Sequence, residues 1–173
     1  MAGKTLKTKW LTTSMFLGAV FSALITFPMT TNAASQQSYK LKIPLGLDEE
    51  AFKVPQDNPM TKEKVELGRL LFFDKRLSAN NTIACASCHI PKFAFTDRIP
   101  RAIGIREQEG SRNTPTLTNV AYQDKFLLDG LNPSLEAQVN IPVHEVKEFD
   151  FSIILVAERM KKNPEYVRLS QEA

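Results

Sequence analysis

Residues 83–91 are Ile83-Ala84-Cys85-Ala86-Ser87-Cys88-His89-Ile90-Pro91, and they hold most of the reactive side chains of the chain. The 173 residues include only two cysteines and two histidines. Three of these four side chains, Cys85, Cys88 and His89, fall within this one short stretch. A helical turn over residues 84–89, ending before the proline, would bring the two thiols and the imidazole close together.

Two thiols three positions apart, followed directly by a histidine, form the CxxCH pattern of covalent haem attachment. Each thiol can add to one vinyl group, and the imidazole can bind the iron. We therefore predict one haem c, anchored by Cys85 and Cys88, with His89 as the proximal iron ligand. A structural zinc site is a weaker alternative, because it would have to recruit His144 without any second CxxC pair. A thiol–disulfide redox pair is also weaker, because its usual βαβ setting is missing from the pattern.

The sequence offers two candidates for the sixth ligand, on the other face of the iron. An electron-transfer cytochrome c commonly has a methionine as sixth ligand. Met160 is the only methionine after His89, and its lysine-flanked setting is typical of a surface helix. His144 is the other candidate, although a lone histidine is more often a surface or hydrogen-bonded residue. The sequence favours an open iron site that admits small ligands and peroxide.

The amino-terminal segment has the features of an export signal. Residues 1–33 have a basic start, an apolar stretch from Leu11 to Phe27, a break at Pro28 and small residues before position 34. We expect cleavage after Ala33 and a periplasmic location, with an uncleaved membrane anchor as the alternative. The segment holds three of the 22 basic residues and none of the 19 acidic ones, so 19 basic residues remain against 19 acidic ones. This balance excludes a basic footprint for nucleic acid.

After the signal, the pattern predicts one mainly α-helical, cytochrome c-like domain. Residues 34–60 are polar and spaced by prolines, which indicates an extended arm, and residues 61–173 form the haem domain. The first helix should begin at Thr61 and end near Asp74. Residues 93–118 show no sustained period, which indicates a long structured loop. Three later helices are expected, with caps at Asn132, Asp150 and Asn163, the first of them ending at Pro142.

Several further runs carry a family resemblance: LGRLLFFD at 67–74, RLS at 76–78, IACASCH at 83–89, FTD at 95–97 and RNTPTLTNV at 112–120. The match continues through residues 129–148 and ends at 163–166, so it covers about residues 40–170. These runs resemble the amino-terminal, peroxidatic haem domain of bacterial di-haem cytochrome c peroxidases and their MauG-type relatives. The resemblance implies a c-type haem protein that reduces hydrogen peroxide to water.

The same resemblance implies roles for individual residues and partners. Gln138 and Glu148 match the distal pair, in which the carboxylate moves a proton between the peroxide oxygens and the amide positions the ligand. A carboxylate in a dry pocket is chemically suited to that transfer. Asn113 matches a residue of a calcium site between the two domains of the family. The implied partners are a small cytochrome c or cupredoxin as electron donor, and a second haem domain or another copy of the chain.

Four positions depart from the family pattern. Ile105 replaces a distal histidine, which implies an iron that is open without reductive activation. Leu127-Leu128 replaces a pair containing a tryptophan that lies between the two haems, and Leu131 replaces an arginine. The chain also has no second CxxCH. A single haem must then place the second oxidising equivalent on the porphyrin, on a residue such as Tyr122, or on a partner. A non-enzymatic electron-transfer domain and an inactive truncated remnant are the alternative functions.

Overall fold

The computed structural model describes residues 38–173, so the predicted signal segment and its cleavage site lie outside the described residues. The first helix, α1 (Lys62–Phe73), begins as the sequence predicts, because the Thr61 hydroxyl accepts a hydrogen bond from the Lys64 amide at 3.1 Å. Asp74 ends this helix and caps the 3₁₀ turn η1 (Lys75–Leu77) with its carboxylate. Residues 38–61, the described part of the chain before α1, contain turns and no helix, and Tyr39 N donates to Met60 O where the chain folds back.

A short helix, α2 (Cys85–Cys88), is followed by three 3₁₀ turns in a long irregular region: η2 (Pro91–Phe93), η3 (Ile105–Glu107) and η4 (Val120–Tyr122). Four helices complete the chain: α3 (Leu135–Gln138), α4 (Asn140–His144), α5 (Ile153–Met160) and α6 (Pro164–Glu172). Within residues 38–173 the only β pairing consists of isolated bridges. The mainly helical fold class is therefore confirmed.

Two of the predicted helix starts are wrong by two residues. Ser134, rather than Asn132, caps α3 by accepting from Ala137 N, and the Asn132 side-chain amide donates to Gln138. Ser152, rather than Asp150, caps α5. The cap at Asn163 before Pro164 is confirmed, since its side chain accepts from Glu165 N.

Pro142 does not end a helix, although the sequence predicted that it would. It lies at the third residue of α4, in the first turn. The amides of a first turn have no partner within the helix, so proline is tolerated there. The helical region therefore continues to His144.

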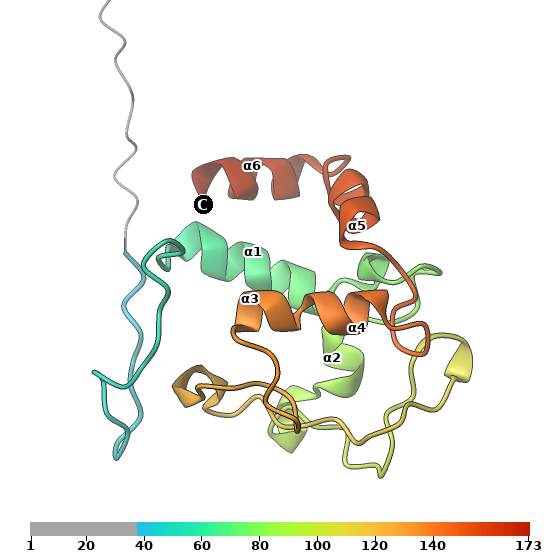
Figure 1. Ribbon diagram of the computed structural model, residues 1–173. Coiled ribbons are helices and arrows are strands. Elements are labelled where there is room, and N and C mark those ends of the chain that lie inside the picture. The colour runs from blue at the N-terminus through green and yellow to red at the C-terminus, as the bar shows by residue number, and fades with distance from the viewer. Residues whose placement is uncertain (1–37) are drawn as a thin grey trace, which may run out of the picture. The chain divides into compact units, whose positions relative to one another are not determined.

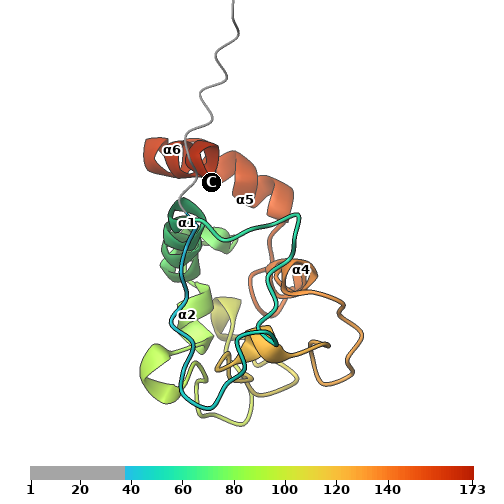
Figure 2. The same cartoon turned by 90° about the vertical axis from the view of Figure 1, so that its left-hand side faces the viewer.

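The hydrophobic core lies between the amino-terminal and carboxy-terminal helices. In Figures 1 and 2, α6 runs alongside α1, and these two elements are in contact. The α2 helix also contacts α1, while α5 contacts η1 and α4. The buried cluster is drawn from four of these elements and a loop: Leu77, Val143, Phe149, Val156, Met160 and Tyr166. Within residues 38–173, the structure contains no helix that is both long and apolar enough to cross a membrane.

Polar contacts fasten the carboxy-terminal helices to the segment before α2. The Tyr166 hydroxyl donates to Asp74 at 2.6 Å, and Arg76 binds the same carboxylate from the side. The Arg159 guanidinium donates to two backbone carbonyls and to Asn81, and it lies over the Phe151 ring. These contacts hold α5 and α6 against the part of the chain that leads into α2.

Candidate haem-binding site

The α2 helix places the two thiols on a single helical turn. The Ser87 hydroxyl accepts from Ala84 N at 3.0 Å, and this bond closes the start of the turn. At the other end, His89 N donates to Cys85 O at 2.8 Å. Both cysteines are free and half-buried, and Cys85 packs against the hydrophobic core. The sequence therefore sets the thiols and the following imidazole in a fixed order along one turn.

The His89 ring is oriented by a backbone carbonyl. Its Nδ1 lies 2.9 Å from Phe95 O. Because a carbonyl oxygen only accepts, Nδ1 carries the hydrogen, and the lone pair is left on Nε2. The loop that supplies this carbonyl turns sharply, with Ala94 and Phe95 both at positive φ, 55° and 59°. A hydrogen bond at Nδ1 that leaves Nε2 to bind metal is the usual arrangement of a ligating histidine.

The thiols lie in a setting that keeps them protonated. Burial raises the pKa of Cys85. Burial, with smaller contributions from the negative charges of Asp97 and Glu148, raises the pKa of Cys88 to about 11. The Cys88 sulfur also lies 3.8 Å from Ile103 O. Both thiols are therefore neutral at pH 7.

Glu148 is half-buried, and burial together with the nearby charge of Glu145 raises its pKa. Its backbone is held on both sides: Glu148 N donates to Glu145 O, and Ile105 N donates to Glu148 O, each at 2.9 Å. Ile105 itself is fully buried. Gly104 lies so close that a Cβ built on it would be 2.0 Å from Lys147 O. Ile105, which stands where the resemblance places a histidine, is therefore hydrogen-bonded to the backbone of Glu148.

Gln138 ends α3, is half-buried, and accepts a 2.6 Å hydrogen bond from the Asn132 amide. This bond fixes the side-chain amide, so its nitrogen is the end that can donate elsewhere. Among the described residues, no hydrogen bond joins Gln138 to Glu148. Their roles as a distal pair stay a prediction.

The donor set fits a covalently attached haem. It comprises two free thiols on one turn and an imidazole whose Nε2 keeps its lone pair. It does not fit the zinc alternative, because within residues 38–173 no three side chains of the His, Cys, Asp and Glu types gather around a metal position. Asn113, the possible calcium residue, lies exposed in the loop.

Comparison with known proteins assigns the family. Residues 62–173 match the model of the di-haem cytochrome c peroxidases. The chain belongs to this family. It is 42% identical to the methylamine utilization protein MauG of Methylorubrum extorquens over 119 residues, which are 69% of this chain and 34% of that protein. It is 32% identical to the cytochrome c551 peroxidase of Pseudomonas aeruginosa over 115 residues, which are 66% of this chain and 33% of that protein.

A solved structure shares the fold. A MauG-like protein associated with microbial copper homeostasis superposes with a TM-score of 0.68 at 31% identity, over 76% of this chain and 39% of that one. The chain thus spans about a third of the length of the relatives it matches. The family relates this chain to haem peroxidases, and the activity of the longer relatives is a proposal for this chain.

The two candidates for a sixth iron ligand differ in their surroundings. Met160 is buried in the hydrophobic core between α5 and its neighbours, so the predicted surface setting is wrong. Val156 is buried one turn earlier on the same helix, which shows that this face of α5 points inward. His144 is exposed at the end of α4, and its Nδ1 lies 2.7 Å from Asn140 O of its own helix.

Three other positions that depart from the family pattern are placed as follows. Leu128 and Leu131 are largely exposed, at 88% and 82%, on the turn around Gly130. Leu127 is less exposed and has a positive φ of 64°. Tyr122 is half-buried against Phe52, ring edge to ring face, and its hydroxyl is buried without a hydrogen-bond partner among the described residues.

Sequence reasoning missed a polar network beside Cys88. Thr114 is buried and donates to Asp97 at 2.6 Å, while Thr96 donates to the backbone carbonyl of Thr114 at 2.9 Å. This network joins the loop after α2 to the loop 17 residues further on. The signals were the runs at 95–97 and 112–120, which contributed to the resemblance but suggested no contact between them.

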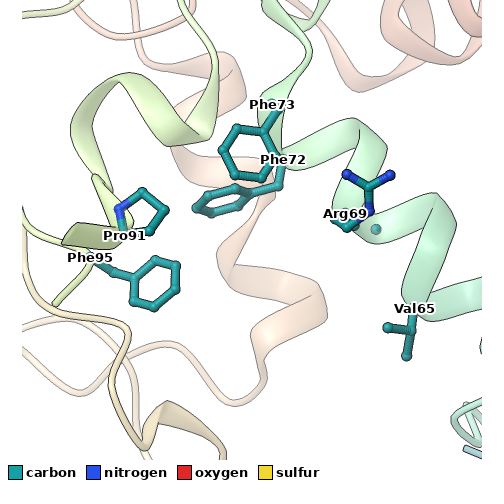
Figure 3. A pocket seen from close by; sticks show the side chains of 7 residues that line it. Val65, Arg69, Phe72, Phe73, Pro91 and Phe95 are labelled. Carbon is teal, nitrogen blue, oxygen red and sulfur yellow. The ribbon is translucent and has the colours of Figure 1, made fainter.

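An open apolar pocket of about 390 Å³ lies between α1 and η2. Figure 3 shows Phe72 and Phe73 of α1 facing Pro91 and Phe95, with Arg69 at the side. Phe95 thus lines this pocket with its ring while its carbonyl orients His89. The pocket borders the loop whose Phe95 carbonyl orients His89, and neither thiol nor Glu148 contributes to its lining.

Proposed function

We propose that the chain is an exported, periplasmic c-type haem domain that reacts with hydrogen peroxide and reduces it to water. The electrons would come from a small cytochrome c or a cupredoxin. One haem would be attached through Cys85 and Cys88, with His89 Nε2 on the iron. Supporting this proposal are the family, the free thiols and the orientation of the His89 ring.

The observation that carries the peroxide proposal is the hydrogen bond from the Ile105 amide to the backbone carbonyl of Glu148. A buried isoleucine has no lone pair to offer iron, and its amide is bonded to the backbone of the candidate acid–base residue. When bound, haem supplies an iron that can take an oxygen atom and electrons. The protein must then supply a proton acceptor and donor beside it, and a half-buried carboxyl with a raised pKa meets that need.

Each residue has a stated task in this proposal. Cys85 and Cys88 tether the haem, and His89 fixes it from one side. Glu148 accepts a proton from one peroxide oxygen and returns it to the departing one, while the free end of the Gln138 amide donates to the bound molecule. Ile105 keeps water and competing ligands out of the space next to Glu148, which strengthens the electrostatic effect of that carboxylate.

The supply of the second electron is part of the proposal. Reduction of peroxide to water needs two electrons, and the iron of a single haem would supply one of them. The porphyrin, Tyr122, a second haem domain or another copy of this chain would supply the other. Calcium bound near Asn113 is a further proposal that follows from the resemblance alone.

The decisive experiment measures the optical spectrum of the ferric protein, produced in a periplasm that attaches haem, before and after one equivalent of hydrogen peroxide. We expect a high-spin spectrum that changes rapidly, and a reaction slowed by 100-fold or more in Glu148→Gln. Glu158→Gln is the matched control, because Glu158 is exposed and pairs only with Lys161. A low-spin spectrum that peroxide leaves unchanged would overturn the proposal in favour of an electron-transfer domain.

Export is tested separately. The mass of the protein recovered from the periplasm should correspond to a chain that begins at residue 34. Recovery of the intact leader in the membrane fraction would replace cleavage with the anchor alternative.

A further inference from the structure

Two loops that are far apart in the sequence lock together at Glu148. Residues 102–110 form a tight loop, closed by the Ile103–Glu109 bridge and by Gly104 N donating to Gln108 O at 2.9 Å. This loop meets residues 145–150 through three contacts. They are a backbone hydrogen bond from Ile105 to Glu148, a side-chain hydrogen bond from Gln108 to Val146 O, and an ion pair between Arg106 and Asp150.

The ion pair joins two residues with unfavourable backbones. Arg106 has φ 54° and Asp150 has φ 48°, both in the left-handed region that non-glycine residues seldom adopt. Glu107, next to Arg106, is also left-handed at φ 59°. Such conformations persist only where surrounding contacts hold them, and they concentrate at functional sites. The 2.7 Å contact from Arg106 Nη1 to Asp150 Oδ2 is the side-chain contact that holds both.

The position of the ion pair matters more than its strength. The side chains of Arg106 and Asp150 are 54% and 32% exposed, and pairs this exposed contribute little to overall stability. Arg106 directly follows Ile105, however, and Asp150 lies two residues after Glu148. The ion pair therefore lies on one side of the Ile105–Glu148 hydrogen bond along the two loops. The close approach of Gly104 to Lys147 lies on the other side.

We propose that Arg106 and Asp150 are positioning residues, which hold the loop carrying Ile105 against Glu148 and so fix the location of the Glu148 carboxyl. This proposal rests on the proposed function, because it assigns a purpose to a fixed Glu148. It also goes beyond that function, since it adds two charged residues that do not touch the reacting atoms. Loss of either partner would release the loop and let water reach Glu148.

The first test measures hydrogen–deuterium exchange in peptides covering residues 102–110 of the haem-loaded protein, without peroxide. Arg106→Gln and Asp150→Asn should each exchange this segment about 3-fold to 10-fold faster than the wild type, because the local opening equilibrium shifts. The double variant should be no faster than either single variant, since both remove the same contact. Arg106→Lys should restore most of the protection. Arg168→Gln is the matched control, because it removes an exposed ion pair with Glu172 in α6.

The second test separates positioning from simple support of the fold. Arg106→Gln should slow the peroxide reaction about 10-fold in the wild-type background but add no slowing to Glu148→Gln, and Arg106→Lys should recover the rate. Unchanged exchange in Arg106→Gln would overturn the ion-pair lock. The positioning role would be overturned if Arg106→Gln speeds the exchange of residues 102–110 but slows the peroxide reaction equally in the wild-type and Glu148→Gln backgrounds. If Glu148→Gln reacts like the wild type, the proposed function fails on its own, while the exchange result still decides the lock.

Discussion

Replacing Gly104 by alanine tests the contact on which the distal side of the site depends. Gly104 has φ −102°, so alanine is permitted by its backbone and only space is at issue. The added Cβ would lie 2.0 Å from Lys147 O and 2.8 Å from Glu148 Cα. An ordinary contact begins near 3.4 Å, so the two backbones must separate by about 1.4 Å (3.4 − 2.0).

The cost follows from what that separation breaks. The hydrogen bond from Ile105 N to Glu148 O is lost, at about 1 kcal/mol. Ile105, now fully buried, becomes partly exposed, at about 1–2 kcal/mol. Gly104→Ala should therefore lower the free energy of unfolding by roughly 2–3 kcal/mol, and the melting temperature by about 5–15 °C for a domain of this size.

Gly68→Ala is the matched control with the opposite sign. Gly68 lies exposed inside α1, and no atom lies within 4 Å of the position of its Cβ. Alanine there should stabilise the protein by about 0.5–1 kcal/mol. Urea unfolding of the two haem-loaded variants measures the difference. If Gly104→Ala is as stable as the wild type, the close packing of the 104–105 loop on Glu148 is refuted.

Three further predictions concern single side chains. Burial and the nearby carboxylate of Glu145 raise the pKa of Glu148, so the native state binds more protons than the unfolded state in this pH range. The free energy of unfolding should therefore fall as the pH rises from about 4.5 through the raised pKa. Urea titrations at several pH values should show this fall in the wild type and not in Glu148→Gln. Burial alone would raise the pKa of Asp74, but hydrogen bonds from Arg76 and Tyr166 outweigh it and lower the pKa. Tyr166→Phe should therefore cost about 1–2 kcal/mol at pH 7, and this cost should shrink as the pH falls through the lowered pKa of Asp74. A cost that stays the same after NMR shows Asp74 to be protonated in the native state would contradict this. Arg159→Leu removes hydrogen bonds to two backbone carbonyls and one side-chain amide, and thermal unfolding should show a loss of about 2–3 kcal/mol, in contrast to no change for Arg168→Leu.

The features that the sequence predicted well are local ones. Thr61 and Asn163 cap helices as expected, because the capping hydroxyl or amide needs only an amide two or three residues ahead. Asn132 and Asp150 were equally plausible caps, but each is bound to a residue that local patterns do not reveal, Gln138 in one case and Arg106 in the other. A serine two residues later then provides each cap.

The site was predictable in its parts and not in its assembly. The CxxCH spacing identifies the thiols and the imidazole, but the carbonyl that orients His89 comes from a loop with two left-handed residues, which carries no spacing signal. Met160 was misplaced because its lysine neighbours outweighed the Val156–Met160 spacing of four, which is the signal of a buried face.

Both candidate functional residues are contacted by backbone groups of loops that contain left-handed residues. Phe95, at φ 59°, offers its carbonyl to His89, and the loop that contains left-handed Arg106 offers the Ile105 amide to Glu148. Backbone groups are fixed once the loop is fixed, whereas a side-chain partner would add its own rotamers, so the Phe95 carbonyl orients the imidazole itself and the Ile105 amide fixes the backbone from which the Glu148 side chain extends. The site borders the hydrophobic core, because Cys85 packs against it and Phe149, the residue after Glu148, belongs to it. Substitutions in this core should therefore disturb the site as well as lower the stability of the domain.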